Sequence, residues 1–186
     1  MGLSFNVPLT FSYRVTDGVA AGIWSSAVLS TYVSVLMGGP QHDATESVGV
    51  ALAVQGMCVV LSAVPAGWLA SRLRKDTILR IMGGVQVSAI LLTSFVLTNT
   101  TWDASRKFLV LCAALALWGT AQGSSLVLDA LLADSVEPSA RASLYGWLHA
   151  ANVVSQGLGP AVAAAVFHAT SDAWHLHTMQ RVMLVG

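Results

Sequence analysis

Five long blocks of apolar residues, each bounded by polar or turn-forming residues, constrain this chain more than any other feature. Each block has about twenty residues, and a helix of that length crosses the roughly 30 Å hydrocarbon core of a bilayer. The chain is 55% hydrophobic and only 10% charged, whereas a typical soluble domain carries about 25% charged residues. A soluble fold of 186 residues could not bury so much apolar surface. We therefore expect lipid to surround these blocks.

The blocks predict helices rather than barrel strands, because they are twice as long as a membrane strand and lack its strict alternation. The expected spans cover residues 19–37, 47–69, 78–97, 108–132 and 143–167, and residues 182–186 begin a sixth. The first block is too long for the core of a signal peptide and lacks a good cleavage site, so it is expected to be retained. Residues 1–186 are thus predicted to be one all-α integral membrane domain.

The basic residues predict an orientation, because lysine and arginine are enriched in cytoplasmic loops. With the N-terminus inside, the cytoplasmic segments hold Arg14, Arg72, Arg74, Lys75, Arg80 and Arg141, and the other side holds Arg106, Lys107 and Arg181. Six residues against three favour a cytoplasmic N-terminus. Nine basic residues balance nine acidic ones, so net charge indicates no nucleic-acid partner.

The turn after the second predicted span carries the most specific motif. It reads Gly67-Trp68-Leu69-Ala70-Ser71-Arg72-Leu73-Arg74-Lys75-Asp76. This segment resembles the major facilitator superfamily signature between helices two and three, Gly-x-Leu-Ala-Asp-Arg-x-Gly-Arg-Arg. Gly67, Arg72 and Lys75 match it, whereas Ser71 replaces the aspartate and Arg74 replaces the second glycine. The glycine is expected to allow close helix contact, and the basic residues are expected to lie near anionic headgroups.

Two later motifs resemble the same superfamily. Between the fourth and fifth predicted spans, Asp134, Pro138 and Arg141 are similar to its Asp-x-x-Pro-x-x-x-Arg connection, with proline displaced by one position. Asp134 is expected to end helix four and Arg141 to open helix five, paired with Asp134 or Glu137. Gly159-Pro160 is similar to part of a motif in helix five of antiporter branches. The resemblance covers residues 18–167 and implies one major-facilitator-like six-helix half-bundle.

Polar residues inside the predicted spans are candidates for a substrate path, because polar groups in hydrocarbon are costly. Trp118 and Gln122 share one face of the fourth span, and His149, Asn152 and Gln156 share one face of the fifth. Family resemblance implies that helix four lines the central cavity and that helix five flanks it. Packing and hydrogen bonds between helices are the alternative interpretation of these five residues.

The resemblance implies a secondary transporter that moves a small solute by alternating access. The apolar run that begins at Val182 is short, so the chain is expected to be a fragment that works with a second half or as a homodimer. A non-transporting membrane scaffold or regulatory half-protein is the alternative. An enzyme is not expected, since no nucleophile-elbow or zinc-protease motif occurs. Neither a cofactor nor a metal is predicted from Cys58, Cys112 or the histidines that follow the fifth span.

Overall fold

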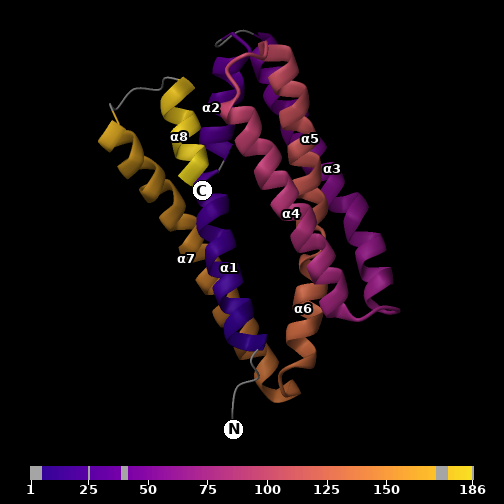
Figure 1. Cartoon of the computed structure of the whole chain (residues 1–186). Helices are drawn as coiled ribbons and strands as arrows, with labels where there is room; N and C mark the ends of the chain where they lie inside the picture. Colours follow the sequence, from indigo (N-terminus) through magenta and orange to yellow (C-terminus); the bar gives the residue numbers. More distant parts are fainter. Residues whose placement is uncertain (1–5, 25, 39–41, 171–175, 186) are drawn as a thin grey trace. The chain divides into compact units, whose positions relative to one another are not determined.

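A computed structural model describes residues 6–24, 26–38, 42–170 and 176–185 of the chain, and this part is helical apart from short turns (Figure 1). The helices are α1 (Asn6–Ile23), α2 (Ser26–Leu36), α3 (His42–Ala70), α4 (Lys75–Thr98), α5 (Ala104–Gln122), α6 (Ser125–Asp134), α7 (Pro138–Thr170) and α8 (Leu176–Val185). These ranges contain no strand. The predicted all-α fold class is confirmed.

Five helical stretches within the described residues are long and apolar enough to cross a membrane. They are Asn6–Leu36, Thr45–Ala70, Lys75–Thr98, Ala104–Asp134 and Pro138–Ala169. Large apolar side chains on α3 remain exposed, including Val64, which is 74% exposed. Such exposure suits lipid, because acyl chains solvate apolar side chains that water would not. The predicted multi-pass membrane protein with five spans is confirmed.

Helix α1 begins at Asn6, well before the predicted start of the first span at residue 19. Local hydrogen bonds support this polar extension, since the Thr10 hydroxyl donates to the Asn6 carbonyl oxygen at 2.8 Å. Packing supports it as well, because Val7 lies in a buried cluster with Leu132 and Leu148. Hydropathy alone did not reveal the extension, because tertiary contacts rather than an apolar run hold it.

The fourth predicted span is divided into two helices, since α5 ends at Gln122 and α6 begins at Ser125. At the division, the backbone N–H of Ser124 donates to the Ala121 carbonyl oxygen at 3.1 Å. The Ser124 hydroxyl donates to the same oxygen at 2.6 Å. The turn therefore satisfies its polar groups locally, as a helix interruption in a bilayer must.

The described residues form two compact units, which we treat separately. The first unit comprises the described residues up to Tyr32 and from Leu131 onwards. In it, α1 lies along α7, and α8 contacts α7 more briefly (Figure 1). Phe11, Leu144 and Tyr145 pack around the buried cluster of Val7, Leu132 and Leu148. This cluster joins the start of α1 to the turn between α6 and α7.

The second unit is Val33–Ala130, and in it α5 packs against both α3 and α4 (Figure 1). Ala66, Ile78 and Val127 form its buried cluster, with Leu69 and Met82 packed against it. These residues come from the end of α3, the start of α4 and the first turns of α6. The cluster therefore fixes the turn between α3 and α4 against the end of the fourth span.

Helices α1 and α7 approach so closely that their contact requires glycine. A Cβ added to Gly22 would lie 2.9 Å from the Gly159 Cα atom and would also collide with the Gln156 carbonyl oxygen. Real Cβ atoms do not come that close to backbone atoms. Small residues at helix crossings allow this kind of backbone contact in membranes.

Replacement of Gly22 by alanine should destabilise the protein by about 1–3 kcal/mol, because the two backbones must separate to admit the methyl group. The measurement is reversible unfolding in detergent, followed by circular dichroism. Gly157→Ala is the matched control in α7, since an added Cβ there meets no described atom within 4 Å. Its stability should stay equal or rise by up to about 1 kcal/mol. Equal losses in both variants would contradict the contact.

Candidate functional site

The turn between α3 and α4 is short and closed by backbone hydrogen bonds. The N–H groups of Arg72 and Leu73 both donate to the Leu69 carbonyl oxygen, at 2.9 and 2.7 Å. The Ser71 hydroxyl donates to the Trp68 carbonyl oxygen at 2.7 Å. Helix α4 then begins at Lys75 without a side-chain cap. The basic residues of the turn are therefore presented on a compact backbone.

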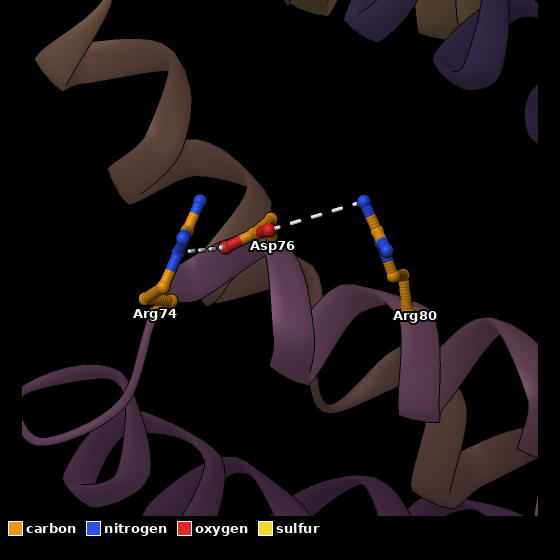
Figure 2. A network of polar contacts seen from close by, with 3 residues as sticks. All are labelled: Arg74, Asp76 and Arg80. Atoms are coloured by element: carbon orange, nitrogen blue, oxygen red, sulfur yellow. Dashed lines mark hydrogen bonds and ion pairs between the residues drawn. The ribbon is translucent and has the colours of Figure 1, made fainter.

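The basic side chains of this turn have different partners. The Arg72 guanidinium lies over the Trp68 ring, 4.3 Å from its centroid. Figure 2 shows Asp76 between two arginines: Arg74 Nε lies 3.2 Å from Oδ1, and an Arg80 terminal nitrogen lies 4.0 Å from Oδ2. The Lys75 amine instead donates to the Ala130 carbonyl oxygen on α6, at 3.4 Å. Lys75 thus connects the start of α4 to the fourth span.

Gly67 does not make the close helix contact expected of it. A Cβ added there would have no atom of the described residues within 4 Å. The residue is exposed in the last turn of α3. Close packing in the same unit occurs instead at Gly119, where an added Cβ would collide with the Gln55 carbonyl oxygen. The motif therefore predicted the position of the turn correctly, but it did not predict which glycine makes the close helix contact.

The turn between α6 and α7 begins where predicted, at Asp134, but the next helix starts at Pro138 rather than at Arg141. Helix α6 ends at Asp134 and α7 begins at Pro138, whose missing N–H costs nothing in a first turn. Arg141 Nε donates to the Val136 carbonyl oxygen at 3.3 Å. No ion pair with Asp134 or Glu137 is formed by Arg141 among the described residues. The arginine therefore fastens the turn through its backbone rather than through a carboxylate.

Trp118 and Gln122, the two candidate path residues on α5, lie in the second unit. Trp118 is 7% exposed, and Gln122 is half-buried. The side-chain amide of Gln55 on α3 donates to the Gln122 amide oxygen at 3.4 Å, near the limit for a hydrogen bond. Gln122 thus has a contact of the kind that the packing interpretation requires, although a weak one.

His149, Asn152 and Gln156, the three candidates on α7, lie in the first unit. Asn152 faces α1, since a Cβ added to Gly18 would lie 3.1 Å from its side-chain oxygen. The side chains of His149 and Gln156 are exposed. Gly159 is buried against Gly22, and Pro160 is exposed within a continuous helix. The five candidates are therefore divided between the two units, two in one and three in the other.

The helical spans, the basic turn after the second span and the Asp–Pro–Arg turn after the fourth occur in the order of a known family. The family model for the Major Facilitator Superfamily matches residues 10–177, which is most of the chain. The chain belongs to the major facilitator superfamily. No curated protein and no solved structure shows a significant match to it. Members of this superfamily are secondary transporters embedded in lipid, and both of the turns described above lie within the matched range.

Sequence reasoning missed several residues that organise this major facilitator chain. Gly18 and Gly22, which admit α7, were not recognised, although their four-residue spacing is the known signal for close crossing. No sequence pattern predicted the hydrogen bond from the Asn6 side-chain amide to the Ser135 hydroxyl, at 3.0 Å. Among the histidines that follow α7, His175 and the side chain of His177 lie outside the described residues. The described residues contain no group of three or more potential metal ligands.

A double-mutant cycle on Gln55 and Gln122 should give a coupling free energy of about 0.6 kcal/mol, the average for hydrogen bonds between membrane helices. Leucine replaces each glutamine singly and then both together, and unfolding in detergent provides the free energies. Gln86→Leu on α4 combined with Gln122→Leu is the control pair and should show additive effects. No coupling between Gln55 and Gln122 would show that the 3.4 Å contact contributes nothing.

Proposed function

We propose that this chain takes part in moving a small solute across a membrane by alternating access. Its membership of the major facilitator superfamily carries the proposal. In such transporters the substrate binds near the middle of the bilayer, between helical repeats. The five polar residues identified above are therefore the proposed substrate path: Trp118, Gln122, His149, Asn152 and Gln156.

The exposure of two residues on α7 supports this assignment. His149 and Gln156 are exposed, and the described residues provide no hydrogen-bond partner for either side chain. Polar side chains turned toward lipid would lose their hydrogen bonds to water, which is costly. A water-filled path or a second protein surface removes that cost. Asn152 and Gln122, which already contact neighbouring helices, have weaker support.

A second helical bundle is part of the proposal. Alternating access in this superfamily is the movement of one bundle against another around a central site. We therefore propose that the chain transports solute together with a second six-helix bundle or a second copy of itself. The exposed apolar residues of α3 and α7, such as Val64 and Val154, suit either such a partner or lipid.

The proposed path predicts that His149→Ala and Gln156→Ala lower the rate or affinity of solute uptake by at least tenfold, because each removes a hydrogen-bonding group worth about 1.5 kcal/mol when water is excluded. Uptake is measured in vesicles that contain the complete transporter, with a library of small radiolabelled solutes. Val153→Ala, an exposed residue on the same helix, is the control and should transport normally.

Three results of this experiment separate the alternatives. Normal uptake in both polar variants would remove His149 and Gln156 from the path. Loss of uptake in Val153→Ala as well would indicate damage to the helix rather than to a path. Assembly with a partner bundle and no uptake of any solute in the wild type would favour the scaffold alternative.

The proposed cytoplasmic N-terminus predicts which side of the membrane each turn occupies. Ser71 and Ser105 are exposed and lie beyond opposite ends of α4, so a cysteine at each position reports one side. An impermeant maleimide should label Ser105→Cys in intact cells and Ser71→Cys only after permeabilisation. Cys58 and Cys112 lie within spans, and their replacement by alanine provides the unlabelled background. The reverse labelling pattern would overturn the orientation.

A further inference from the structure

We propose that the turn between α3 and α4 binds the phosphate headgroup of an anionic phospholipid. The site is the Arg72 cluster, which we define as Trp68, Arg72, Leu73, Arg74 and Arg80. The proposal goes beyond solute transport and assigns this surface a lipid ligand. It depends on neither the proposed path nor the proposed orientation.

Arg72 is held in place without being neutralised. Its guanidinium lies 4.3 Å above the centroid of the Trp68 ring. The structure gives Arg72 no acidic partner among the residues that it describes. Stacking on an aromatic face orients a guanidinium and leaves its in-plane N–H groups free to donate. Those donors match the oxygens of a phosphate, which arginine binds with two parallel hydrogen bonds.

Arg74 and Arg80 add positive charge that the turn does not balance. Both side chains are 84% exposed, and both rely on the single carboxylate of Asp76 (Figure 2). The Arg80 contact is at 4.0 Å, the outer limit of an ion pair. With Arg72, the turn and the start of α4 therefore carry three guanidinium groups, and two of them share the single carboxylate of Asp76. An anion bound among them would gain attraction from all three.

Ser71 increases this excess of positive charge. The superfamily signature that the turn resembles has an aspartate at this position, whereas this chain has serine. The Ser71 hydroxyl donates to the Trp68 carbonyl oxygen at 2.7 Å and brings no charge. The turn therefore lacks the acid that would compete with a bound phosphate for the neighbouring Arg72.

The depth and the apolar residues of the cluster favour a lipid over a soluble phosphate. The second span ends at Ala70 and the third begins at Lys75, so the cluster lies where two spans end. Trp68 is 54% exposed and Leu73 is 49% exposed. Tryptophan is enriched at this level because its ring is amphipathic. A phospholipid presents a phosphate and an acyl chain together, which matches guanidinium groups beside exposed apolar side chains.

The test is a titration of the full chain in detergent with phosphatidylglycerol or phosphatidylcholine, with bound lipid counted by native mass spectrometry. The wild type should bind phosphatidylglycerol more tightly. Arg72→Gln and Arg80→Gln should each weaken that binding about fivefold, the effect expected for one basic residue near an anionic surface. Arg72→Lys should also weaken the binding of phosphatidylglycerol, because lysine keeps the charge but lacks the planar guanidinium group that binds two phosphate oxygens at once.

Arg106→Gln is the matched control. Arg106 stacks on Trp102 at 4.7 Å, beyond the other end of α4, so this variant removes a similar pair from a different site. Its lipid binding should equal that of the wild type. Equal binding of the two lipids, or wild-type affinity in both Arg72→Gln and Arg80→Gln, would overturn the proposal. If Arg72→Lys bound phosphatidylglycerol as tightly as the wild type, charge attraction alone would explain the binding, and the proposed two-oxygen contact of Arg72 would be wrong. If glycerol 3-phosphate displaced phosphatidylglycerol at equal concentration, the site would bind a soluble phosphate rather than a lipid.

Discussion

The need to satisfy every backbone polar group without water governs this structure. In hydrocarbon an unpaired N–H or C=O group costs several kcal/mol, so helices that satisfy themselves are the available solution. The same rule holds where the helices are interrupted. At the division of the fourth span, the Ala121 carbonyl oxygen accepts from both the N–H and the hydroxyl of Ser124. An irregular turn is thus placed in a span without leaving these groups unpaired.

Once the helices form, each unit brings two of them into close contact through a pair of glycines. In the first unit, Gly18 and Gly22 of α1 face α7, and in the second, Gly119 of α5 and its C-cap residue Gly123 face α3. Each pair is four residues apart and so lies on one face. The second glycine of each pair also lies where its helix ends, because α1 ends at Ile23, directly after Gly22, and α5 ends at Gln122, directly before Gly123. Since apolar burial gives no net attraction between helices in lipid, close backbone packing is the main source of their association.

The sequence predicted the features that depend on composition and missed those that depend on contacts. Apolar blocks and turn residues placed five spans, and Asp134 marks the observed end of α6, although α7 begins at Pro138 rather than at Arg141. The early start of α1 was missed because it arises from packing between distant segments. The carbonyl partner of Arg141 lies only five residues away, but the pattern of acidic and basic residues favoured a carboxylate partner. Helical periodicity grouped the candidate path residues by face. It could not show that Asn152 contacts α1 while His149 is left exposed.

Polar side chains inside the spans fall into two groups, those that hydrogen-bond to their own helix and those that do not, and the difference bears on function. Thr93, Thr120 and Ser155 donate to carbonyl oxygens four residues earlier and need no partner from outside their helix. His149 and Gln156 have no such local bond among the described residues. Imidazole and carboxamide groups are also too long to fold back onto their own helix as a serine hydroxyl does. Their hydrogen-bonding capacity must be met by water, solute or another protein surface, which makes α7 a better place than Gln122 to search for the substrate.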